Sequence, residues 1–227
     1  MKVSRTLHLR DHRSCLIMKT IISLWLSLWV LGPITAQPFN IGHRQLTFID
    51  ADRNDRPILT ELYYPSATTG DNVPVSDVGG ETYPVVAFGH GFVMEWSAYA
   101  NIWNAIVPEG YIIAFPRTET GISPDHLTFA RDLAFIIRAI QEEGKTAGSP
   151  FFGRVDSTSC VMGHSMGGGS SFLAVQFNED ISAVVNFAAA ETNPSAIDVC
   201  PTIQIPALIF AGGNDCITPP ETNQVVM

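Results

Sequence analysis

From about residue 80 onward, short apolar runs alternate with longer amphipathic stretches. Each apolar run has the length of a buried strand, and the stretches between them keep the spacing of a helix. The clearest helical stretch is 124–142, which turns polar residues such as Asp132 away from its apolar face and has Ser123 placed to cap it. The pattern predicts strands at 84–88, 111–115, 159–162, 181–188 and 207–211, and helices at 96–107, 124–142 and 167–177.

The segment before this alternation is different. Residues 45–50 and 58–64 are strand-like and flank a polar turn, which predicts an antiparallel pair. Together the two patterns predict an α/β fold, a mostly parallel sheet with helices on both faces, in which the last strands are buried. Only a short tail follows 207–211, so we expect the last strand and helix of the fold to be missing and the sequence to be truncated at its C-terminus.

The first 36 residues look like a targeting segment rather than part of the fold. Lys19 precedes an apolar run at 21–31 that is short for a membrane span, and a small residue, Ala36, follows it. This order predicts a secretory signal peptide at 1–36, with a membrane anchor as the alternative. Met18 is the better initiator, so we interpret 1–17 as a start assigned too early. One α/β domain at 37–227 is then expected, in a secreted or periplasmic protein.

The net negative charge of the sequence disfavours some classes of binding partner, because it repels other anions. The 227 residues carry 13 basic and 22 acidic side chains, and residues 1–36 hold five of the former and one of the latter. The remainder therefore has 8 against 21, a net charge of −13, which repels nucleic acid and anionic lipid. We expect no nucleic-acid partner and no stable membrane insertion after signal cleavage. No spacing of Cys and His suggests a metal, and no cofactor is expected; whether Cys200 pairs with Cys216 is left open.

The strongest chemical signal is a G-x-S-x-G sequence at 163–167. An expected strand precedes it and an expected helix follows it, so Ser165 would sit on a sharp turn with its hydroxyl exposed above the sheet. This context predicts a nucleophile; the alternative is a glycine-rich turn with an idle serine. The backbone N–H of Met166 would be one oxyanion donor, and that of Phe92, or of Gly91, the second.

A serine nucleophile needs a carboxylate and a histidine. Asp215 follows the strand at 207–211 and is the candidate acid; Glu191 is the alternative, and the Asp215 loop could also be a plain turn. A histidine should come later still, but none follows Asp215, and the six present are poorly placed as bases: His8, His12, His43, His90, His126 and His164. We therefore expect the catalytic histidine after residue 227 and near-background activity from the chain as written.

These segments resemble a known family. Gly-His-Ser-Met-Gly-Gly-Gly at 163–169, Phe-Gly-Arg-Val-Asp at 152–156 and the segment 205–219 are similar to secreted α/β-hydrolases. The resemblance is strongest to the dienelactone-hydrolase-like branch, with its bacterial cutinases, poly(ethylene terephthalate) hydrolases, chlorophyllases and platelet-activating-factor acetylhydrolases. It implies an α/β-hydrolase fold in which Ser165 is the nucleophile, Asp215 the acid, and Phe92 and Met166 the oxyanion donors. The polyester-cleaving members carry a tryptophan after the strand equivalent to 181–188, and here 188–191 has none.

The expected function is therefore a secreted serine hydrolase that cleaves small or polymeric carboxylic esters through an acyl-enzyme. The same residues would serve a peptidase or a thioesterase, because a fold does not fix its substrate. A third interpretation is an inactive fragment or pseudoenzyme that acts as a binding protein.

Overall fold

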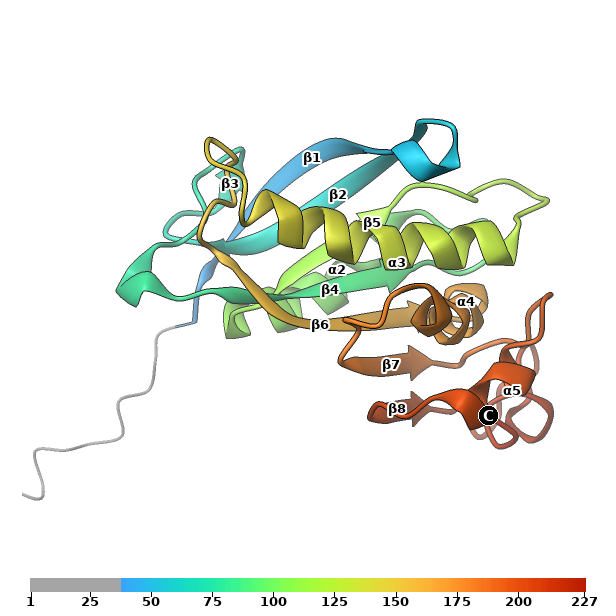
Figure 1. The fold of residues 1–227 in the computed structure, drawn as a ribbon. Coiled ribbons are helices and arrows are strands. Elements are labelled where there is room, and N and C mark those ends of the chain that lie inside the picture. The colour runs from blue at the N-terminus through green and yellow to red at the C-terminus, as the bar shows by residue number, and fades with distance from the viewer. Residues whose placement is uncertain (1–37) are drawn as a thin grey trace, which may run out of the picture. The chain divides into compact units, whose positions relative to one another are not determined.

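The computed structural model describes residues 38–227; the predicted signal peptide, His8 and His12 lie outside the described residues. Within this range the strands form one sheet in the order β3-β1-β2-β5-β4-β6-β7-β8 (Figure 1). The strands are β1 (Asn40–Asp50), β2 (Arg56–Ser66), β3 (Gly70–Asp71), β4 (Tyr83–Gly89), β5 (Ile112–Pro116), β6 (Val155–His164), β7 (Ala183–Phe187) and β8 (Ala207–Phe210). The α-helices are α2 (Ala100–Ile106), α3 (His126–Glu143), α4 (Met166–Ala174) and α5 (Ala196–Val199).

Strand pairing confirms the predicted fold class. β1 and β2 form the expected antiparallel pair, in register from Asn40 opposite Ser66 to Asp50 opposite Arg56, and β2 is antiparallel to β5. All neighbours from β5 through β4, β6 and β7 to β8 are parallel. The carboxyl ends of these five strands meet at one edge of the sheet, where parallel α/β sheets place their functional loops.

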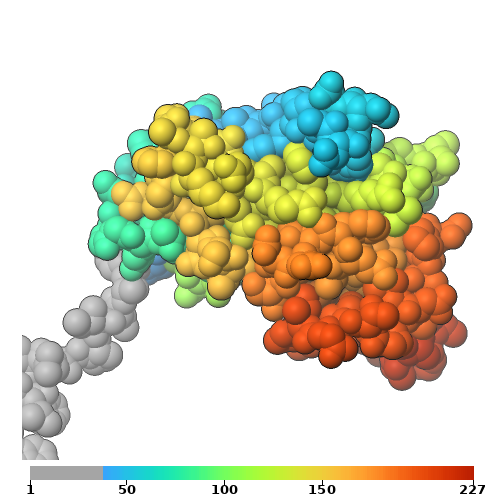
Figure 2. Space-filling view, viewed as in Figure 1, coloured from blue at the N-terminus to red at the C-terminus, as the bar shows by residue number. Residues whose placement is uncertain are grey.

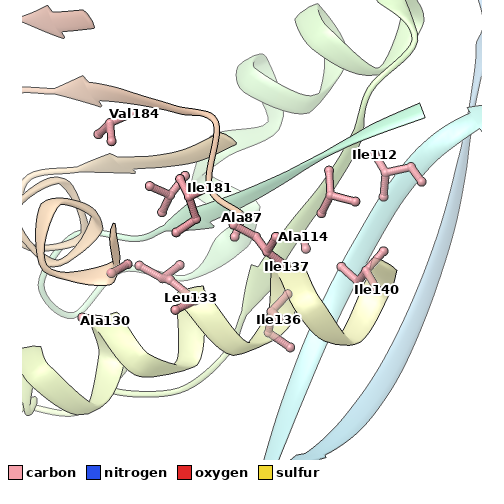
Figure 3. Close-up of a cluster of buried hydrophobic side chains, with 14 of the residues drawn as sticks. Ala87, Ile112, Ala114, Ala130, Leu133, Ile136, Ile137, Ile140, Ile181 and Val184 are labelled. Atoms are coloured by element: carbon pink, nitrogen blue, oxygen red, sulfur yellow. The ribbon is translucent and has the colours of Figure 1, made fainter. Parts of the chain in front are cut away.

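Helices cover both faces of the sheet. α3 and α4 lie across one face, and their atoms cover the middle of the sheet in the space-filling view (Figures 1 and 2). An apolar core lies beneath α3, with Leu133 and Ile137 pointing toward Ala87 and Ala114 (Figure 3). A second core lies on the opposite face, where α2 packs; its buried members are Val86, Phe88, Tyr99, Val107, Ile113, Phe115 and Met162. Neighbouring strand residues alternate between the two cores, as the period of a strand requires.

Two expectations about the long helix were wrong. Asp125, not Ser123, caps α3, and its carboxylate accepts the Thr128 N–H at 2.8 Å. Asp132 is fully buried instead of facing solvent, because Arg53 and Arg56 of the β1–β2 region reach over the helix and pair with it. Asp132 also follows Phe129 by three residues and precedes Ile136 by four, and both of these are fully buried, so the helical period itself is compatible with a buried position.

The last described strand leaves apolar side chains exposed. β8 is an edge strand that pairs only with β7 among the described residues, and the side chains of Leu208 and Phe210 are 53% and 48% exposed. The apolar run at 207–211 has the pattern of a buried strand, but in this structure it forms an exposed apolar edge, as we expect for a chain that lacks the last strand and helix of the fold. Cys160, Cys200 and Cys216 are all free thiols. No helix in the range 38–227 has the length and apolar character to cross a membrane.

Candidate active site

Ser165 occupies the sharp turn between β6 and α4. Its backbone has φ 54° and ψ −121°, a conformation that costs a non-glycine residue about 1–3 kcal/mol and persists only where the surroundings enforce it. The enforcement comes from hydrogen bonds on both sides: Ser165 N–H donates to the Phe187 carbonyl at 3.0 Å, and the Ser165 carbonyl accepts from Ala190 N–H at 2.9 Å. The two hydrogen bonds therefore hold Ser165 in a strained turn between β6 and α4.

The glycines of the motif are required by close backbone approach. A Cβ on Gly163 would collide with the Gly167 carbonyl, and a Cβ on Gly167 would collide with the backbone of Gly89 at the end of β4. Glycine at these positions lets the first turn of α4 lie directly against β4 and β6. This contact brings the Ser165 turn and the loop after Gly89 together, as the sequence predicted.

The two proposed oxyanion donors sit on these adjoining segments. Met166 is the first residue of α4, and Phe92 lies in the loop after β4 with its side chain 52% exposed. Among the described residues, neither backbone N–H has a hydrogen-bond acceptor. The alternative donor fails, since Gly91 N–H already donates to the hydroxyl of Tyr99 at 2.7 Å.

Asp215 is held in a tight turn after β8. Its Oδ1 accepts the N–H groups of Ile217 and Thr218 at 2.8 and 3.0 Å, and its Oδ2 accepts the Thr218 hydroxyl at 2.8 Å. Backbone and side-chain hydrogen bonds from Thr218, with a further one from Ile217, hold the pKa of Asp215 below its ordinary value. The alternative acid, Glu191, instead accepts the N–H of Ile197 at 3.1 Å.

The described histidines are engaged elsewhere. His43 lies in β1 between Asp71 and Glu61, and both ring nitrogens of buried His90 face carbonyls, those of Gly91 and Thr118. The Nδ1 of His126 accepts the backbone N–H of Asn193 at 3.0 Å, and the Nδ1 of His164 lies 3.0 Å from the Tyr99 hydroxyl. Between residues 38 and 227, no histidine hydrogen-bonds to Ser165 or Asp215.

The polar role of Tyr99 could not be predicted from the sequence. Its ring is buried against Phe88, with ring centroids 4.7 Å apart, while its hydroxyl contacts Gly91, Met94 and His164. No sequence pattern marks such a residue, because the contact with His164 joins positions 65 residues apart. The described chain holds no cluster of three or more His, Cys, Asp or Glu side chains suited to a metal ion.

The fold is that of an α/β-hydrolase. It has the order of strands in the sheet, the strained serine between β6 and α4, and Asp215 in the loop after β8. A family model described as PETase, PET hydrolase-like, matches residues 60–227. The chain belongs to this PET hydrolase-like family.

Three relatives show how far the similarity extends. Cutinase est1 of Thermobifida alba is 29% identical, covering 80% of this chain and 54% of the relative. Chlorophyllase-1 of Arabidopsis thaliana is 28% identical, covering 69% and 46%, and a bis(hydroxyethyl) terephthalate hydrolase of Streptomyces coelicolor is 26% identical, covering 70% and 45%. The chain spans about half the length of the curated relatives it matches.

Proposed function

We propose that this protein is a serine hydrolase that cleaves carboxylic esters through an acyl-enzyme. Ser165 attacks the ester carbonyl, the backbone N–H groups of Phe92 and Met166 hold the resulting oxyanion, and Asp215 orients the histidine that carries the proton. The observation that carries the proposal is the strained backbone of Ser165, which its hydrogen bonds with Phe187 and Ala190 hold in place.

The environment of each group supports its proposed role. The Phe92 and Met166 N–H groups lack acceptors among the described residues, so both are available to an oxyanion beside Ser165. Three hydrogen bonds favour the ionised form of Asp215. An acid that stabilises an imidazolium must be ionised. Because His43, His90, His126 and His164 are all held by other groups, the proposal takes the base from outside the described residues.

The substrate class rests on the relatives and on the rim of the site. The named relatives include two ester hydrolases, a cutinase and a bis(hydroxyethyl) terephthalate hydrolase. The loops after β4 and β8, which carry the proposed oxyanion donor Phe92 and the proposed acid Asp215, expose apolar residues, among them Phe92 and Val93 at 52% each and Ile217 at 84%. We infer a small or polymeric ester with an apolar acyl or alcohol part, and a protein that acts outside the cytoplasm.

The test is turnover of p-nitrophenyl acetate and butyrate by the intact protein and by Ser165→Ala. The variant should retain the fold and lose activity by about 10³-fold or more, as removal of a triad member does. Ser157→Ala is the matched control, since Ser157 is exposed at the start of β6 and should leave turnover unchanged. A fluorophosphonate should label the wild type and the control but not Ser165→Ala.

Three outcomes would contradict the proposal. Near-wild-type turnover by Ser165→Ala removes this serine from the mechanism. Faster cleavage of a peptide anilide or a thioester than of the esters moves the protein to another hydrolase class. Absence of all turnover and labelling in a wild-type protein that carries the histidine base favours a binding protein built on the hydrolase fold.

A further inference from the structure

A single buried hydroxyl joins the two segments that carry the proposed chemistry. Tyr99 ends a short 3-10 helix at Trp96–Tyr99, directly after the loop that bears Phe92, and is only 6% exposed. Its hydroxyl oxygen accepts the Gly91 N–H at 2.7 Å and lies 3.0 Å from the Nδ1 of His164. Gly91 immediately precedes the proposed oxyanion donor, and His164 immediately precedes the proposed nucleophile.

Gly91 packs closely against the Tyr99 hydroxyl and leaves no room for a side chain of its own. A Cβ on Gly91 would lie 2.8 Å from the Met94 sulfur, 3.0 Å from His164 Nδ1 and 3.3 Å from the Tyr99 hydroxyl. Gly91 has an unexceptional φ, so its lack of a side chain is explained by this crowding and not by the backbone conformation. The loop is therefore drawn against Tyr99 as closely as its atoms allow.

The hydrogen bonds have a consistent direction. Burial raises the pKa of Tyr99, which keeps its proton, and burial lowers the pKa of His164, which favours the neutral ring that can accept a hydrogen bond at Nδ1. Gly91 N–H then donates to the tyrosine oxygen, and the tyrosine O–H donates to His164 Nδ1. The Met94 sulfur, 3.2 Å away, is a second acceptor for the same proton.

We propose that Tyr99 is a positioning residue for catalysis, whose hydroxyl fixes the Phe92 N–H relative to Ser165 by bonding to both neighbouring segments. The inference rests on the ester-hydrolase function proposed above. Removing an oxyanion donor altogether lowers kcat by about 10²–10³-fold, so displacing one by loosening its loop should lower kcat by about tenfold. KM should change little, because the lost interaction forms with the transition state and not with the bound ester.

The test variant is Tyr99→Phe, which keeps the ring in its packing against Phe88 and removes only the hydroxyl. Tyr83→Phe is the matched control: Tyr83 is similarly buried, and its hydroxyl donates to the Ser76 carbonyl at 3.3 Å, away from the Ser165 turn. Both variants should unfold at similar temperatures, while only Tyr99→Phe should lose kcat. The inhibition constant of phenylboronic acid, whose adduct with a serine places an oxygen where the oxyanion forms, should rise by a similar factor in Tyr99→Phe alone.

A double-mutant cycle with His164→Ala separates positioning from general destabilisation. If the hydroxyl acts through its bond to His164, the two substitutions together should cost much less than the product of their separate effects. Equal kcat and equal boronate inhibition in Tyr99→Phe and Tyr83→Phe would overturn the inference while leaving the ester-hydrolase proposal intact. Absence of ester turnover in a wild-type protein that carries the histidine base would overturn both.

Discussion

Replacing Asp132 with asparagine should destabilise the protein far more than its place on a long amphipathic helix suggests. The Asp132 carboxylate is fully buried and takes part in four polar contacts. Arg56 binds it through two nitrogens at 3.0 and 2.8 Å, Arg53 through one at 2.7 Å, and the Thr118 hydroxyl donates at 2.6 Å. The hydrogen bond to Asp132 is the main reason that the pKa of Arg56 is raised.

The expected loss of unfolding free energy follows from the two arginines that the substitution leaves without their counter-ion. An asparagine side chain has the shape of aspartate without its charge, so the side chains of Arg53 and Arg56, 19% and 28% exposed, would lose their buried counter-ion. Breaking such a pair from one side costs about 3–5 kcal/mol. Arg53 keeps Asp50 and Arg56 keeps Glu119, which places the expected loss near the lower end, about 3 kcal/mol.

Urea denaturation followed by circular dichroism measures this loss directly, and thermal unfolding should show a decrease in Tm of roughly 6–12 °C for a domain of this size. Glu142→Ala is the control on the same helix: Glu142 and Lys145 form an exposed pair at 3.4 Å that should contribute less than about 0.5 kcal/mol. An Asp132→Asn variant no less stable than Glu142→Ala would refute the reasoning that the buried network holds α3 to the β1–β2 region.

Two further predictions concern the acid loop and export. Thr218→Val removes one hydrogen bond to Asp215 and should raise the pKa of that carboxyl toward 3.8, as measured by carbon-detected NMR titration. A carboxyl with a lowered pKa stabilises the fold at pH values above its unfolded-state pKa, and this stabilisation is lost as the pH falls through its folded-state pKa. The variant, with the higher folded-state pKa, should therefore lose the stabilisation at a higher pH than the wild type. An unchanged titration curve of Asp215 would contradict this. Export should cleave the chain after Ala36, so that N-terminal sequencing of secreted protein begins at Gln37; a mature protein beginning at Met1 or Met18 would show that no signal is removed.

The sequence alone determined those features that depend on neighbours along the chain. The spacing of apolar residues predicted the antiparallel pair β1–β2, the parallel strands and the long helix α3. A strand or helix that buries one or both faces needs apolar residues at regular intervals along the chain, and these intervals can be seen in the sequence. The G-x-S-x-G motif likewise predicted the turn at Ser165, since only a strand, a sharp turn and a helix make use of small residues at those spacings.

Tertiary structure decided what depends on segments far apart in sequence. Asp132 is a charged residue that we expected to face solvent, and its burial is made possible by Arg53, Arg56 and Thr118, which come from other segments and pair with its carboxylate. Tyr99 has the pattern of one more core aromatic until its hydroxyl meets Gly91 and His164. Polar contacts of this kind are set by which loops the fold brings together, and a one-dimensional pattern of apolar and polar residues holds no record of them.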